Sequence, residues 1–349
     1  MKKHLIAAAV AAAVAVPAAA QVTIKGVIDT GVANLDSGTA EQTTTKSNVI
    51  GTTSYSITGT EDLGGGLKAT FNLTQEFSMD NGGHTDASAP AAADYSTPHT
   101  AVISTNSFQD ASLAISGGFG SVKFGHITFA SRDASGVGRF AGNFGRLSGA
   151  IRTNGDKVDN GIEYTTPTFN GITAAIGVAN QGSASAAAAT PKDTGVFLRY
   201  AQGPFAAALG QTTRDVGGAA DNTETVVGVQ YDAGVAKFGI VRGQDNGNNA
   251  SASAANLSRL TGTTYQASIP LNNGLTVIVG GSSYKNTANT ADAKGFSLMA
   301  RKDLSKRTAV YAYTDNMKNK GSVLISGSAA GGTAAKTANA TGVGFLHSF

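Results

Sequence analysis

Few residues in this sequence have the types and spacing that covalent chemistry requires. The chain contains no Cys, and its five His are scattered at positions 4, 84, 99, 126 and 347. Because thiols are absent and no two His have the spacing of metal ligands, disulfide scaffolds, thiol catalysis and His- or Cys-based metal sites are all disfavoured. We therefore expect neither a metal nor a cofactor.

Short matches to catalytic motifs carry little weight here. Residues 36–39 read Asp-Ser-Gly-Thr, which matches the short aspartic-protease pattern, but the sequence has no second copy and two carboxylates are needed. We interpret this match as an Asp-Ser-Gly turn. The glycine run 64–66 lacks the Gly-Lys-Ser/Thr of a phosphate loop, and no Gly-x-Ser-x-Gly elbow occurs. The sequence therefore predicts no catalytic residue and a protein that is not an enzyme.

The N-terminus predicts export from the cytoplasm. A basic start at Lys2 and Lys3 is followed by the apolar run 5–16 and a small-residue end at 17–20, which is typical of a cleaved signal peptide. We expect residues 1–20 to be removed and residues 21–349 to form a single domain. That mature chain keeps 24 of the 26 Lys and Arg against 23 Asp and Glu, so its net charge of +1 argues against nucleic-acid binding.

The composition favours a β-rich fold. The chain has 349 residues with 45 Gly and only 14% charged residues, and no later window holds 18 uninterrupted apolar residues. Several segments instead alternate apolar and polar residues with a period of two, as a strand between an apolar and an aqueous phase would. These segments include 23–30, 67–77, 121–127 and 159–166. Such strands, closed into a barrel, are the other way in which a chain spans a membrane.

The connections between these segments alternate in length. Short turns are expected at 61–66, 117–120, 167–171, 202–204, 232–234, 270–274 and 303–306. Long polar connections are expected at 35–48, 79–106, 128–158, 181–193, 213–222, 244–258, 286–293 and 316–336. Counting the runs between them predicts an all-β, transmembrane, antiparallel β-barrel of about 16 strands, with short turns at one end and long loops at the other. The chain ends in Phe349, which we interpret as the aromatic end and assembly signal of a last outer-membrane strand.

At this point the sequence resembles the Gram-negative general diffusion porins, in particular the trimeric, anion-favouring porins of betaproteobacteria. The resemblance covers essentially the whole chain and is most specific at residues 22–32, 59–71, 116–126, 159–177, 303–316 and 342–349. It implies a homotrimer in the outer membrane, in contact with its lipid, with short periplasmic turns, long extracellular loops and a third loop folded into the pore. It also implies passive diffusion of ions and small hydrophilic solutes, with a weak preference for anions.

The charged loop 128–158 corresponds in position to the inward-folded loop of this family. It holds five basic residues against two acidic ones, and a narrow aqueous passage with that bias concentrates anions. The candidate constriction residues are Arg132, Asp133, Arg139, Arg146 and Arg152. At Ser54, Thr58 and His126 the sequence lacks basic residues that related porins often carry, which weakens the expected preference for anions.

Strand phase supplies the candidate pore-lining residues, each on the polar face of its run: Lys25, Lys68, Lys123, Arg199, Lys237 and Arg301. His126 falls on the apolar phase, which favours a packed side chain over a pH gate. Aromatic residues near strand ends are expected at the lipid interface: Phe71, Phe124, Tyr164, Phe169, Tyr200, Phe205, Tyr231, Phe238, Tyr311 and Tyr313.

Two other kinds of protein fit parts of the same pattern. A barrel that does not conduct but binds a partner through its long loops would have the same alternating strands, because its outer face also meets lipid. A soluble β-sandwich would alternate as well, since its strands have an inner and an outer face.

Overall fold

The structure is a computed structural model that describes residues 21–38, 40–80, 108–142, 144, 157–180, 192–215, 221–246, 260–286, 292–319 and 337–349. The predicted signal peptide, residues 1–20, lies outside this set. Among the described residues, no helix has the length and apolar character that crossing a membrane would take.

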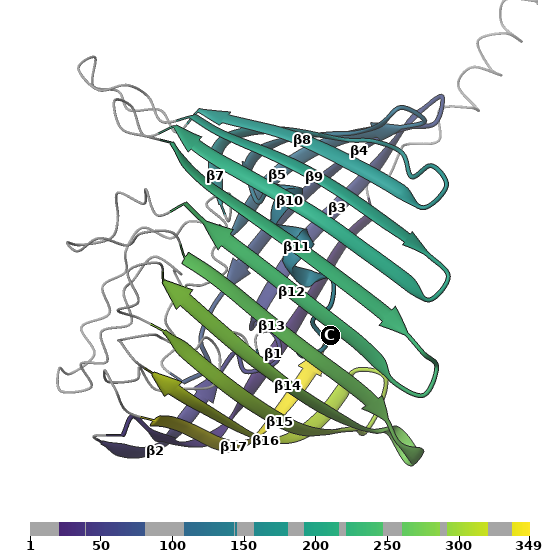
Figure 1. The fold of residues 1–349 in the computed structure, drawn as a ribbon. Coiled ribbons are helices and arrows are strands. Elements are labelled where there is room, and N and C mark those ends of the chain that lie inside the picture. The colour runs from purple at the N-terminus through teal and green to yellow at the C-terminus, as the bar shows by residue number, and fades with distance from the viewer. Residues whose placement is uncertain are drawn as a thin grey trace, which may run out of the picture.

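The described chain forms one antiparallel sheet (Figure 1). Its strands are β1 (Gln21–Asp36), β2 (Glu41–Ser47), β3 (Ser54–Gly64), β4 (Leu67–Glu76), β5 (Asp110–Gly117), β6 (Gly120–Ile127), β7 (Val158–Thr165), β8 (Ile172–Asn180), β9 (Lys192–Gln202), β10 (Phe205–Asp215), β11 (Asn222–Asp232), β12 (Lys237–Asp245), β13 (Leu260–Pro270), β14 (Leu275–Asn286), β15 (Ala293–Asp303), β16 (Thr308–Asn319) and β17 (Thr337–Ser348). Two short 3₁₀ helices, η1 (Ala130–Gly136) and η2 (Asn272–Gly274), complete the elements.

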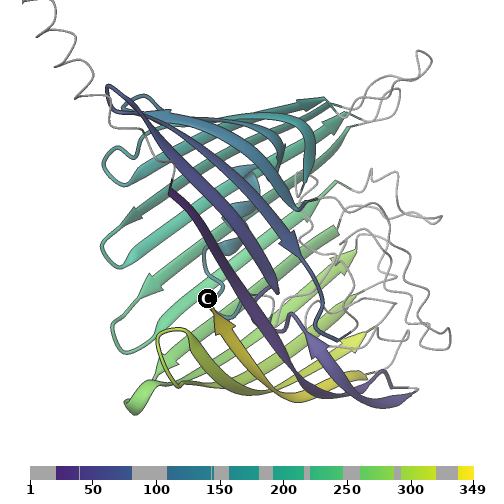
Figure 2. The same cartoon turned by 180° about the vertical axis from the view of Figure 1, so that it is seen from behind.

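The sheet closes into a barrel because its first strand pairs with its last strand. β1 pairs with β17 from Val27 and Ser348 onward, and Figure 2 shows the yellow β17 lying beside the purple β1. Gly26 and Phe349 extend this pairing by exchanging two backbone hydrogen bonds of 3.0 Å. On its other side β1 pairs with β2 along one half and with β3 along the other half, so that β2 and β3 share one position in the wall. The result is a closed barrel of 16 strand positions, as the sequence predicts.

The two ends of the barrel differ in the way that was predicted. Every connection expected to be a short turn joins neighbouring strands at one end, where the turns lie on the right in Figure 1. The expectation of a long polar connection over 35–48 was wrong, because β1 continues to Asp36 and β2 occupies Glu41–Ser47. In the turn between them the Asp36 carboxylate accepts the N–H of Gly38 at 2.7 Å, so the Asp-Ser-Gly sequence forms an Asx turn there.

The two faces of the wall differ in polarity. Ile176 in β8 and Val196 in β9 point outward and are exposed, whereas Ala175 and Phe197 point inward and are buried. A soluble protein does not expose such a continuous apolar surface, but a barrel in a bilayer requires it.

Two aromatic residues lie on the opposite face from the one predicted. Tyr311 and Tyr313 point into the barrel and are 4% exposed, so they are not part of an interfacial girdle. The buried carboxylate of Asp315 lies on the same face of β16, and this acidic residue identifies that face as the inner one.

Candidate pore constriction

The described part of segment 128–144, residues 128–142 and 144, folds into the barrel and follows its inner wall. Its η1 helix contacts β8 to β12, and the short ribbon of η1 is visible inside the barrel in Figure 1. A row of inward-facing glycines, one on each of these strands, receives the segment: Gly177, Gly195, Gly210, Gly228 and Gly239. At Gly177 an added Cβ would lie 2.6 Å from the ring of Phe129, and at Gly210 it would collide with the Ser131 carbonyl. The missing side chains therefore allow the backbone to lie flat against the wall.

The far end of the segment is fixed by Gln266 of β13. Its side-chain oxygen accepts the N–H of Phe140 at 2.8 Å, and its side-chain nitrogen donates to the carbonyl of Phe144 at 3.0 Å. The Phe144 ring is fully buried and meets the ring of Tyr313 edge-on at 5.6 Å. These contacts hold the backbone at Phe140 and Phe144, and the Phe144 ring, against the wall.

A second inward segment, 48–53, connects β2 to β3. Asn48 has a positive φ of 65°, and its side-chain oxygen accepts the N–H of Thr53 at 2.7 Å. Asp29 of β1 accepts the N–H groups of Ile50 and Gly51 at 2.6 and 2.8 Å. Val49 and Ile50 pack with Ala141 and Phe144 in a cluster inside the barrel. The two inward segments thus meet, and together they fill the part of the lumen beside β1 and β14 to β17.

Three of the predicted constriction residues lie on the described part of segment 128–144. Arg132 and Asp133 belong to η1, and Arg139 follows it. Arg139 donates from Nε to the Ser135 carbonyl and from Nη2 to Ser135 Oγ at 3.0 Å, so its guanidinium is held beside η1. Desolvation by the surrounding protein raises the pKa of the Asp133 carboxyl, whereas the positive charges of Lys123, Arg132 and Arg199 act in the opposite direction. Arg146 and Arg152 lie outside the described residues.

Two of the predicted strand residues meet η1. Lys123 of β6 and Arg199 of β9 line a recess with Asp133. Lys123 forms an ion pair of 3.3 Å with Glu163 of β7, which is 4% exposed, and Glu163 also accepts the N–H of Ala130 at 2.6 Å. Glu163 therefore ties the start of η1 to the wall and neutralises much of the charge of Lys123. Glu163 is not among the pore-lining residues predicted from the sequence, although alternation puts it on the same face of β7 as Thr165; its place opposite Lys123 is set by the register between β6 and β7.

The other four predicted strand residues lie at the end of the barrel with the short turns. Lys237 pairs with Asp232 at 3.3 Å across a turn, and Arg301 pairs with Asp303 at 2.9 Å on its own strand. Lys68 is exposed near the turn between β3 and β4, and Lys25 is exposed in the first part of β1, opposite Ser56 of β3. All four share the inward phase of their strands, but the structure does not bring them to the inward segments.

Away from the turn, the inner wall of β3 to β5 presents hydroxyl and amide groups together with the carboxylate of Asp110. Ser56 lies 2.8 Å from Thr74, Thr58 donates to Asn72 at 3.0 Å, and Asn72 donates to Asp110 at 3.0 Å. Thr58 is one of the three positions at which the resemblance to related porins leads us to expect a basic residue. His126 instead faces outward, with its Nδ1 2.6 Å from the exposed carboxylate of Asp159.

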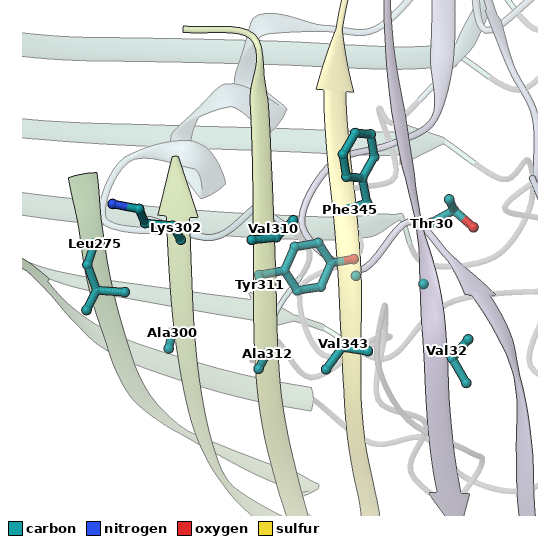
Figure 3. Close-up of a pocket in the computed structure, with 12 residues that line it drawn as sticks. Thr30, Val32, Leu275, Ala300, Lys302, Val310, Tyr311, Ala312, Val343 and Phe345 are labelled. Atoms are coloured by element: carbon teal, nitrogen blue, oxygen red, sulfur yellow. The ribbon is translucent and has the colours of Figure 1, made fainter. Parts of the chain in front are cut away.

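The outer wall carries a shallow groove across β1 and β14 to β17 (Figure 3). Small residues such as Ala300 and Ala312 form its floor, and Val343 and Phe345 stand beside them on β17. Lys302 lies at the end near the short turns and donates to the Asn273 carbonyl. The groove is part of the apolar outer face of the barrel.

A closed antiparallel barrel with an apolar outer wall and a charged segment folded inside it defines a transmembrane channel. The sequence profile of the Gram-negative porin family matches residues 7–322. The chain therefore belongs to the Gram-negative porin family, and it is an outer-membrane porin channel of a Gram-negative bacterium.

Individual relatives agree with this assignment. The chain is 31% identical to outer membrane porin protein 32 of Delftia acidovorans, with all of both chains covered. It is 28% identical to an outer membrane porin protein of Bordetella pertussis, covering 91% of this chain and 95% of that one. Among solved structures, the anion-selective porin from Comamonas acidovorans superposes with a TM-score of 0.75 at 26% identity, covering 95% of this chain and 100% of that one. The trimer form of OmpT from Vibrio cholerae shares the fold, with a TM-score of 0.67 at 15% identity, covering 95% of this chain and 100% of that one.

Proposed function

We propose that this porin conducts ions and small hydrophilic solutes passively, with a weak preference for anions and without catalysing a reaction. The observation that carries the proposal is the seating of η1 against the wall, which holds Arg132 and Arg139 inside the lumen. Positive charge in a narrow aqueous passage raises the local concentration of anions. The preference is weak because Glu163 pairs with Lys123 and because the wall of β3 to β5 offers hydroxyls at positions such as Thr58.

The remaining parts of the proposal concern processing and assembly. Residues 1–20 are removed on export, and residues 21–349 form the mature domain with Phe349 as its assembly signal. Three barrels associate in the outer membrane, surrounded by its lipid. The resemblance to trimeric porins supports the trimer, and the apolar outer wall supports the contact with lipid.

Single-channel recording in a planar bilayer with a salt gradient tests the proposed selectivity. Stepwise currents whose reversal potential favours anions are expected. Replacing Arg132 and Arg139 together by Ala should shift the reversal potential toward cations, whereas Arg307→Ala in a turn should not. Deleting residues 135–149 should raise the conductance. A folded barrel that conducts no current would instead favour a protein that binds a partner through its loops.

A further inference from the structure

The recess beside η1 has the size of a small-molecule site. It is bounded by η1, β6, β7, β8 and β9 and has a volume of about 440 Å³. Small-molecule sites in proteins usually measure roughly 300–1,000 Å³. A solute crossing the lumen therefore finds a concave place beside η1 in which it can be held.

The charges of the recess come in two groups. Lys123 and Glu163 form an ion pair with each other, so together they add little net charge. Asp133 and Arg199 line the same recess from η1 and β9, and the positive charge of Arg199 acts on the Asp133 carboxyl. Within the part of the chain that the structure describes, neither Asp133 nor Arg199 takes part in an ion pair or side-chain hydrogen bond.

These two unpaired charges discriminate between classes of solute. A simple anion would be attracted by Arg199 and repelled by Asp133, and a simple cation would experience the reverse. A zwitterion can place its carboxylate on the guanidinium and its ammonium on the carboxylate, gaining both interactions at once. Of the three classes, only the zwitterion fits both groups.

The remaining lining fits the rest of such a solute. Phe197 and Val137 contribute apolar surface, and Thr165 and Thr173 contribute hydroxyl groups. An apolar side chain of modest size would contact the Phe197 ring, while the hydroxyls supply further hydrogen bonds to a carboxylate or ammonium group.

We propose that the recess between Asp133 and Arg199 is a transient binding site for small zwitterions, in particular α-amino acids with a neutral side chain. This inference rests on the proposed function as a diffusion channel and names a class of solute that the channel retains on passage. Arg199 would bind the carboxylate, and Asp133 would bind the ammonium group.

Three solutes of nearly equal shape test the proposal. L-valine carries both charges, isovalerate lacks the ammonium group, and isobutylamine lacks the carboxylate. Each is added at equal concentration to single channels in a planar bilayer, and the blockade of the ion current is measured. L-valine should block transiently, and the other two should block at least about tenfold more weakly, because each loses one charge-assisted interaction.

Variants assign the blockade to the two residues. Arg199→Gln and Asp133→Asn should each raise the half-blocking concentration of L-valine about tenfold or more, for the same reason. Arg307→Gln removes an equal charge from a turn far from the recess and should leave the blockade unchanged. Arg199→Lys keeps the charge but loses the bidentate fork, so it should fall between the parent and Arg199→Gln.

The outcomes separate this inference from the proposed function. A conducting channel that isovalerate blocks as well as L-valine does, or whose blockade strengthens in Asp133→Asn, has a simple anion site, and the inference is wrong. A conducting channel that L-valine does not block also overturns it. Isothermal titration calorimetry with L-valine reads out binding without conduction. Heat that is lost in Arg199→Gln would therefore support the site even in a barrel that fails to conduct.

Discussion

The hydroxyl of Tyr311 donates a hydrogen bond of 2.5 Å to the buried carboxylate of Asp29, across the seam where the barrel closes. The same carboxylate accepts the N–H groups of Ile50 and Gly51. One side chain of β1 thus joins β16 to the inward segment 48–53. The ring of Tyr311 lies over Gly344 of β17, where an added Cβ would collide with it. The closure of the barrel and the filling of its lumen therefore depend on the same contact.

Tyr311→Phe should loosen segment 48–53 without disrupting the sheet. The substitution removes one donor from a buried carboxylate, which costs about 1–3 kcal/mol. We expect a lower temperature for the loss of folded migration on gels and greater current noise, because segment 48–53 packs against Ala141 and Phe144. Tyr265→Phe, on the exposed outer face of β13, is the matched control and should change neither property. A quiet and equally stable Tyr311→Phe channel would mean that the apolar cluster alone fixes the segment.

Gly177→Val should displace the start of segment 128–144. A side chain at this position collides with the buried ring of Phe129, and overpacking of this kind costs roughly 1–3 kcal/mol. Since the wall cannot yield outward without breaking its hydrogen bonds, the segment should move toward the open lumen and lower the single-channel conductance. Gly118→Val is the control, because an added Cβ there meets nothing within 4 Å. Equal conductance in the two variants would show that Phe129 relocates without narrowing the passage.

The sequence predicted the strands of the barrel wall better than the two segments that fold into the lumen. Alternation located β4 and β6 and put Lys123 and Arg199 on their inner faces, because a period of two follows directly from strand geometry. The sequence did not predict that segment 48–53 folds into the lumen, because a short inward segment has the same polar composition as an external loop. The inward glycines at 177 and 195 were visible in the sequence, and a glycine in the middle of a strand does indicate close approach of another backbone. Which segment packs against such a glycine could not be predicted, because it depends on contacts between residues far apart in the chain, such as Phe129 and Gly177.

Lysine at two adjacent positions of β3 should have opposite effects. Thr58 faces inward and donates to Asn72, whereas Ile57 pairs with the exposed Ile24 on the outer face. Thr58→Lys should fold, insert and shift the reversal potential toward anions, because it adds a positive charge to a wall that now has hydroxyls. Ile57→Lys places the charge in lipid, at a cost of up to about 2–4 kcal/mol near the midplane, and should reduce insertion.

Measurements of folding yield and of reversal potential for this pair check both the orientation of β3 and the origin of the weak selectivity. If Thr58→Lys inserts well but leaves the reversal potential unmoved, the wall of β3 to β5 does not face the conducting path.

The selectivity should depend on pH through Asp133. Because desolvation raises the pKa of this carboxyl, it takes up a proton at a higher pH than a free aspartate does. As the pH falls through that value the negative charge of Asp133 is lost, and the charge beside η1 becomes more positive. The preference for anions should therefore increase on acidification.

Reversal potentials recorded across a pH series check this dependence. Asp133→Asn should show the stronger anion preference already at neutral pH and should change less on acidification than the parent does. Glu163 faces the same recess and pairs with Lys123, so Glu163→Gln serves to separate the two carboxyls. If the parent and Asp133→Asn follow the same pH curve while Glu163→Gln flattens it, Glu163 and not Asp133 is the titrating group.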